Sequence, residues 1–273
     1  SDTEVLLKTL NLYGWKALNL LDGMWAFSYY NKISKEIIIS RDRFGEKPLY
    51  YIKKKHYLLF ASNINYLRQL YSEKLNLNKE KILRFLSFGF SEIGFNQKTI
   101  FKDVNILFPG RSIIINKKNK FKIKKYWNIK IKKNHNLSYQ ESVETLTRKL
   151  KNILNTRFRS DVPLAALLSG GIDSSSISGI AKELNVKLKC FSIKTNMKEY
   201  KEDKYINANI KYTNFKHNFV KIPKKDNLTR LRKITEPISP FFFANYERLY
   251  AAHKIETCSA LESVFFNSSG VNN

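Results

Sequence analysis

The sequence predicts two domains of different class, an α+β domain built on antiparallel strands followed by an α/β domain built on a parallel sheet. The 273 residues are enough for about two domains of roughly 150 residues each. Short β-rich runs separated by turns fill the first half, whereas apolar strands alternate with amphipathic helices in the second. Nine lysines and no acid lie between Lys117 and Lys133, so we expect domains at 1–133 and 138–273.

The first half begins with a predicted helix and continues mainly as strands. Ser1 and Glu4 form the pattern of a capping box, and the helix is expected to stop near Gly14. β-branched and aromatic residues then predict a mostly antiparallel meander, with strands at 24–30, 36–41, 49–52 and 57–61. The half is completed by helices at about 63–70 and 78–88 and by a hairpin of 111–115 and 121–126.

A long amphipathic helix at about 139–158 opens the second half. Strands are then expected at 162–168, 188–193 and 218–222, with helices at 174–184 and 199–212 between them. The same pattern continues with helices at 227–235 and 244–253 and a strand at 263–266. Because strands and helices alternate and the strands are almost continuously apolar, we expect a parallel sheet covered on both faces.

The net charge of +26 invites an interpretation as a binder of nucleic acid or anionic membranes. Only 11 of the 49 basic residues are Arg, however, and Lys is the weaker choice for bidentate recognition of phosphates or bases. The hydrophobic content of 43% excludes wholesale disorder. No apolar run approaches the length of a membrane span, and Cys190 and Cys258 match no disulfide framework or zinc spacing. We therefore expect a cytoplasmic protein, with surface or structural roles for its four histidines.

A Gly-Gly segment between a predicted strand and a predicted helix carries the chemistry. Gly170 and Gly171 let backbone N–H groups approach an anion, and the following helix adds its positive end and the hydroxyls of Ser174 and Ser175. This predicts a phosphate cradle, although neither GxxxxGK[ST] nor GxGxxG is present. Asp173 within the cradle indicates Mg²⁺, because a bare carboxylate would repel phosphates. The structural alternative is a glycine-rich turn with Ser174 as an ordinary N-cap.

Several segments together resemble a known family. Residues 169–175 (SGGIDSS) resemble the PP-loop of ATP pyrophosphatases, which attack the α-phosphate of ATP, form an adenylate and release pyrophosphate. Residues 21–27 (LDGMWAF) and 41–51 (RDRFGEKPLYY) look like the glutaminase domain of the glutamine-hydrolysing asparagine synthetase family. Residues 99–101, 108–110 and 126–127 resemble that family's exit from its first domain.

The resemblance implies a fold and a set of site residues. It implies a partial glutaminase of the Ntn β-sandwich type in 1–133 and the start of a PP-loop domain, like that of adenine nucleotide alpha-hydrolases, in 138–273. Asp2 matches the residue that holds the glutamine amino group, although a helix cap is the structural alternative. The cysteine nucleophile of the family would precede Ser1, so we expect no glutamine hydrolysis by the sequence as given.

The synthetase half of the resemblance implies an ATP site with Asp173 as its catalytic and metal-binding acid. Leu167 and Ile193 match positions beside the base and ribose, where plain buried strand residues are the alternative. A second family loop, Ser-Gly-Glu-Gly-x-Asp-Glu, has its best match at 267–273, with Ser269 at the adenylate site and neutral residues in place of the acids. The implied ATP contacts are Leu167, Ser169, Gly170, Gly171, Asp173, Ser174, Ser175, Ile193, Asn267 and Ser268.

The function implied by the resemblance is an ATP-dependent amide ligase. It would adenylate aspartate or a related carboxylate and transfer ammonia derived from glutamine, with ATP and Mg²⁺ as cofactors and without specific nucleic-acid or membrane partners. A homodimer stays open. Two alternatives also stay open: an RNA-modifying enzyme with the same ATP loop, for which the basic charge would suit tRNA, and a catalytically impaired fragment of a synthetase-like protein.

Overall fold

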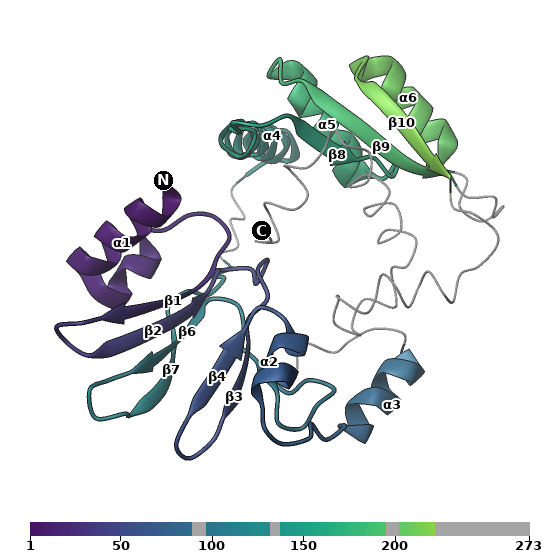
Figure 1. Cartoon of the computed structure of the whole chain (residues 1–273). Coiled ribbons are helices and arrows are strands. Elements are labelled where there is room, and N and C mark those ends of the chain that lie inside the picture. The colour runs from purple at the N-terminus through teal and green to yellow at the C-terminus, as the bar shows by residue number, and fades with distance from the viewer. Residues whose placement is uncertain (89–96, 132–136, 195–201, 222–273) are drawn as a thin grey trace. The chain divides into compact units, whose positions relative to one another are not determined.

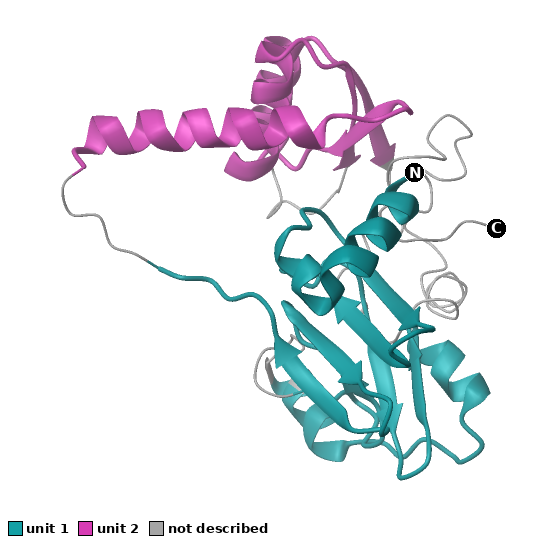
Figure 2. Ribbon diagram, turned by 90° about the vertical axis from the view of Figure 1, so that its left-hand side faces the viewer, with its two compact units in different colours: residues 1–131, 237–244 teal, residues 132–236, 245–273 magenta. Residues whose placement is uncertain are grey.

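A computed structural model describes residues 1–88, 97–131, 137–194 and 202–221 (Figure 1). The chain divides into two compact units, and the division between them falls after Ile131 (Figure 2). The helices and strands predicted at 227–235, 244–253 and 263–266 lie outside the described residues, as do Asn267, Ser268 and Ser269.

Unit 1 contains two antiparallel sheets with helices. Its elements are α1 (Asp2–Tyr13), the 3₁₀ helix η1 (Gly14–Asn19), β1 (Ala26–Asn31), β2 (Glu36–Arg41), β3 (Tyr50–Lys53), β4 (Leu58–Ala61), α2 (Ile64–Leu70), α3 (Lys79–Phe88), β5 (Asn105–Ile106), β6 (Arg111–Ile115) and β7 (Phe121–Lys125). One sheet has the strand order β1-β2-β6-β7, and the other has the order β4-β3-β5. The predicted antiparallel hairpins and helices are therefore confirmed.

The predicted meander is wrong in one respect, because the first two hairpins belong to different sheets. Strand β2 pairs on its second edge with β6, with Ile39 opposite Ile113, and not with β3. Both strands lie in the middle of this sheet, and both carry fully buried isoleucines on their faces. A pairing of residues this far apart in sequence leaves no local pattern to read.

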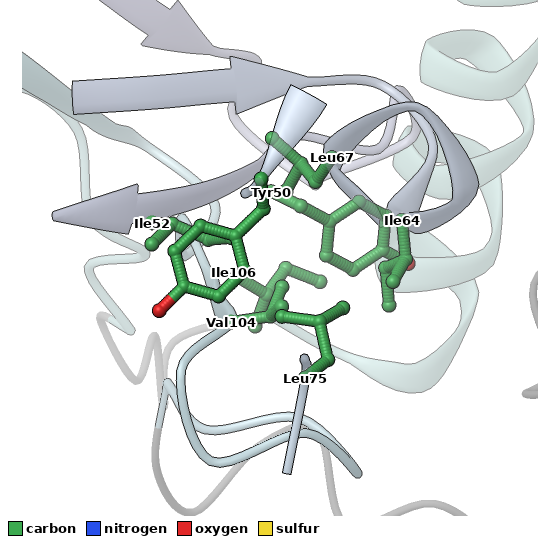
Figure 3. Close-up of a cluster of buried hydrophobic side chains, with 8 residues drawn as sticks. Tyr50, Ile52, Ile64, Leu67, Leu75, Val104 and Ile106 are labelled. Carbon is green, nitrogen blue, oxygen red and sulfur yellow. The ribbon is translucent and has the colours of Figure 1, made fainter. Parts of the chain in front are cut away.

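Apolar residues arrange unit 1 as helix, sheet, sheet and helix. The side chains of strand β3 point alternately to its two faces, and both faces are buried. Tyr50 and Ile52 point into a cluster with Leu67 of α2 (Figure 3). Tyr51, on the opposite face, packs with Ile39 of the other sheet. Beyond that sheet, β2 packs against buried residues of α1 and η1.

Unit 2 is a parallel sheet with helices. Its described elements are α4 (Tyr139–Arg157), β8 (Leu164–Leu167), α5 (Ile172–Glu183), β9 (Leu188–Lys194), α6 (Asp203–Thr213) and β10 (Lys216–Lys221). The strand order is β10-β9-β8, and both pairings are parallel, which confirms the predicted sheet for these strands. The helices α5 and α6 pack together against one face of the sheet, through Leu168, Ala181, Cys190 and Ile206. No helix in the described part of the chain is both long and apolar enough for a bilayer span.

Candidate functional site

The Gly-Gly loop lies where strand β8 leaves the parallel sheet. Leu167 is the last residue of β8 and pairs with Phe191 of β9. The next residue, Leu168, still donates its N–H to the Phe191 carbonyl at 2.8 Å, and its side chain is buried. The chain then turns through Ser169–Gly171 into α5. The loop is therefore at the carboxyl end of the strands, the edge at which open α/β sheets bind ligands.

The N-terminus of α5 has no side-chain cap. The helix begins at Ile172, two residues before the predicted start, and its N-cap is Gly171. The structural alternative of Ser174 as N-cap is therefore wrong, because Ser174 lies inside the first turn. The other long helix of this unit, α4, has a complete capping box from Ser138 and Glu141. Without such a cap, the first N–H groups of α5 are available to an anion and carry the positive end of the helix dipole.

Gly170 is required by the shape of the turn. Its φ of +84° lies in the region that side-chain-bearing residues rarely adopt. A Cβ atom at this position would lie 3.1 Å from the Glu202 carbonyl oxygen and 3.2 Å from Ile206 Cγ1. The beginning of α6 thus packs directly against the turn and fixes its shape.

Two serine hydroxyls connect the ends of the loop. Ser169 Oγ lies 3.2 Å from Ser174 Oγ, and the Ser169 N–H donates to Ser174 Oγ at 3.3 Å. Ser174 Oγ also donates to the Gly171 carbonyl, and the Gly171 N–H lies 3.4 Å from Ser169 Oγ. Ser169 is exposed and Ser174 is half-buried. These hydroxyls connect the N–H groups of Ser169 and Gly171 within the turn.

Asp173, Ser175 and the two strand residues are the remaining predicted residues of this unit that the structure describes. Asp173 is exposed in the first turn of α5, where the helix dipole favours a negative group. No group of three or more His, Cys, Asp or Glu side chains with metal-site geometry occurs among the described residues. Leu167 and Ile193 are half-buried near the carboxyl ends of β8 and β9. Ser175 donates its N–H to the Gly171 carbonyl within α5.

Sequence reasoning missed a polar contact behind the loop. Ser192 of β9 is buried and donates a hydrogen bond from Oγ to the Leu168 carbonyl. His217 of β10 places Nε2 2.8 Å from the same Oγ. Burial lowers the pKa of His217 below its ordinary value. Only the pairing of β10 with β9 brings these residues together, and the histidine spacing in the sequence carries no sign of it.

Asp2 lies in the other unit and is exposed in the first turn of α1. Ser1 is the N-cap of this helix and accepts from the Glu4 N–H at 3.4 Å, so the cap is Ser1 and not Asp2. The predicted role of Asp2 in binding glutamine stays a prediction.

The motif at 41–51 forms a turn that depends on two buried charged residues. The Asp42 carboxylate accepts backbone N–H groups of Phe44, Glu46 and Lys47 at 2.9–3.0 Å. The neighbouring Arg41 guanidinium donates to three backbone carbonyls, including that of Leu107 at 2.7 Å. Both side chains are almost fully buried, so Arg41 and Asp42 stabilise the turn rather than presenting a charged site.

Comparison with known proteins defines the class of this chain. Residues 1–127 match the family model of the glutamine amidotransferase domain, and residues 145–252 match that of asparagine synthase. The chain thus combines an amidotransferase domain with a synthetase domain.

The curated relatives are of the same kind. A putative glutamine-hydrolysing asparagine synthetase 2 of Methanocaldococcus jannaschii is 31% identical over 83% of this chain and 44% of its own length. Asparagine synthetase 1 of Bacillus subtilis is 34% identical over 71% of this chain and 30% of its own. Amidase chyE of Penicillium rubens is 32% identical over 67% and 27%. The chain belongs to the glutamine-hydrolysing asparagine synthetase family and spans less than half the length of these relatives.

Proposed function

We propose that this chain is part of an ATP-dependent amide ligase, in which unit 2 binds ATP through residues 169–175. The observation that carries the proposal is the uncapped N-terminus of α5, which follows a Gly-Gly turn at the carboxyl edge of the sheet. Backbone N–H groups at this position bind phosphate oxygens without a basic side chain. The amidotransferase and asparagine synthase matches support the reaction class.

The proposed domains follow the sequence prediction. Residues 1–133 would be the part of an Ntn-type glutaminase that follows its nucleophile, and the helix–sheet–sheet–helix layers of unit 1 support this. Residues 138–273 would begin the PP-loop domain. Asp2 would hold the amino group of glutamine, and ammonia from the glutaminase would attack the adenylate in the synthetase.

The described residues would act by position and charge. Donors from Ser169, Gly170, Gly171 and the first turn of α5 would stabilise negative charge on the departing pyrophosphate. Asp173 would hold Mg²⁺, which supplies positive charge to the phosphates when bound. Leu167 and Ile193 would offer apolar surface to the base and ribose. The Asn267–Ser269 part of the site stays a prediction from the sequence.

The acid that receives the amide is aspartate or a related carboxylate in this proposal. Relatives with similar identity include both asparagine synthetases and a protein named as an amidase, so the family alone does not select one acid.

ATP–pyrophosphate exchange with a panel of carboxylic acids tests the reaction in a protein that extends this chain to the length of its relatives. We expect exchange that depends on one of the acids and is lost in Asp173→Asn. The matched control is Asp161→Asn, which changes an exposed aspartate outside the loop and is expected to keep the exchange. Exchange that is independent of every acid, or unchanged in Asp173→Asn, would contradict the proposal.

A further inference from the structure

The hydrogen bonds of Ser192 and His217, which lie behind the Gly-Gly loop, have a defined direction. The Ser192 hydroxyl has one hydrogen, and the Leu168 carbonyl can only accept, so this hydrogen lies between the two oxygens. Ser192 Oγ must then accept from His217, and Nε2 of His217 must carry a hydrogen. The chain of donors therefore runs from His217 through Ser192 to the backbone of Leu168.

The accepting carbonyl is the last backbone group before the loop. The Leu168 N–H is already bound to the Phe191 carbonyl at 2.8 Å, so both backbone polar groups of this residue are attached to β9. Its side chain is 2% exposed and packs with Cys190 and Ile206. The next residue, Ser169, is exposed and begins the phosphate cradle. The direction in which the chain leaves the sheet is thus fixed at Leu168.

We propose that His217 is a positioning residue for the nucleotide loop, and that it acts through Ser192 by fixing the Leu168 carbonyl. This inference rests on the proposed ATP site and adds to it His217, which is 25 positions beyond Ser192 and is connected to the loop through it. His217 supplies an N–H donor and an aromatic ring, which packs edge-on against Phe219 at 4.5 Å between centroids. Its contribution is a loop held in the binding shape before ATP arrives, which lowers the cost of ordering on binding.

Four variants separate the donor from the bulk of the side chain. Ser192→Ala removes the middle of the chain of donors, and His217→Phe keeps a ring but no donor. His217→Gln restores an N–H group at a similar reach. Cys190→Ala is the matched control, because Cys190 is equally buried two residues before Ser192 on the same strand and also loses one heavy atom on substitution.

The experiment measures two quantities for each variant of this chain: its affinity for ATP with Mg²⁺, by equilibrium dialysis, and the amide NMR shifts and hydrogen exchange of Gly170 and Gly171. We expect Ser192→Ala and His217→Phe each to weaken ATP binding about three- to tenfold, the effect of one lost hydrogen bond. The double variant Ser192→Ala with His217→Phe is expected to bind ATP no more weakly than either single variant, because both substitutions break the same connection. His217→Gln should recover most of the ATP affinity. Cys190→Ala should lower the stability of the chain and leave its ATP affinity unchanged.

The two readouts keep this inference separate from the proposed function. If the unaltered chain binds no ATP, the proposed function fails, and the Gly170 and Gly171 amides still test the positioning role. Unchanged amides in Ser192→Ala and His217→Phe would overturn the inference, as would effects on ATP affinity that add in the double variant. An effect of Cys190→Ala equal to that of Ser192→Ala would also overturn it, because loss of packing alone would then explain both.

Discussion

Two glycines of unit 2 have opposite requirements, and exchanging each for alanine tests the geometry of the loop. Gly170 has a φ of +84°, and a Cβ atom there would lie 3.1–3.3 Å from backbone and side-chain atoms of Glu202 and Ile206. Gly179 lies inside α5, where the nearest atom to an added Cβ is Tyr212 Cε1 at 3.8 Å, an ordinary contact.

The expected magnitudes follow from these environments. An alanine with positive φ costs about 1–2 kcal/mol, and the close contacts add to this cost. Gly179→Ala is expected to stabilise the helix by about 0.5–1 kcal/mol, because alanine is the better helix former and loses less entropy on folding. The free energy of unfolding of unit 2 should therefore differ by about 2 kcal/mol between the two variants, with Gly170→Ala the less stable.

Hydrogen exchange of the α5 backbone amides measures this difference within the unit concerned. ATP affinity should also fall in Gly170→Ala and stay unchanged in Gly179→Ala. Equal protection of α5 in the two variants would refute the left-handed turn at Gly170 and its contact with α6.

Three further predictions concern single side chains. Asp42→Asn should lower the free energy of unfolding of unit 1 by about 2–3 kcal/mol, because the buried carboxylate accepts three backbone N–H groups. Tryptophan fluorescence during urea unfolding measures this change, since all three tryptophans lie in that unit. An unchanged midpoint would contradict the role of the turn. Burial lowers the pKa of His217, so the unfolded chain binds a proton first as the pH falls. The urea midpoint of unit 2, measured by circular dichroism, should therefore decrease below about pH 6.5, and this decrease should shrink in His217→Gln. Burial raises the pKa of the Cys190 thiol to about 11. In a Cys258→Ser variant, Ellman's reagent should therefore react with Cys190 only after unfolding. Rapid reaction of the folded chain would show that the thiol is exposed.

Local sequence patterns predicted most elements of the fold. Hydrophobic periodicity located the long helix α4 and the three parallel strands, and turn residues located the hairpins of unit 1. The patterns could not show that β2 pairs with β6, because this choice depends on which buried edges meet and not on either strand alone. They also missed β5 and η1, which are too short for a period to be visible.

The part of the candidate site that depends on local sequence was predictable, and the part that depends on strand pairing was not. The sequence correctly placed residues 169–171 between a strand and a helix, and the binding roles of residues 169–175 stay predictions. The start of α5 was placed two residues late, since a serine is the usual N-cap and Gly171 takes that position instead. The support from Ser192 and His217 needed the register of β9 and β10 and could not be read from spacing.

The phosphate cradle is tested most directly by amide NMR of this chain titrated with ATP and Mg²⁺, with adenosine as the comparison ligand. We predict that ATP, and also pyrophosphate alone, will shift the amide signals of residues 169–175. Adenosine is predicted to leave the signals of these residues unchanged. Loss of these shifts in Gly170→Ala should accompany loss of affinity. ATP binding that leaves the amides of Gly170, Gly171 and Ser174 unchanged would contradict the assignment of this loop as the ATP site.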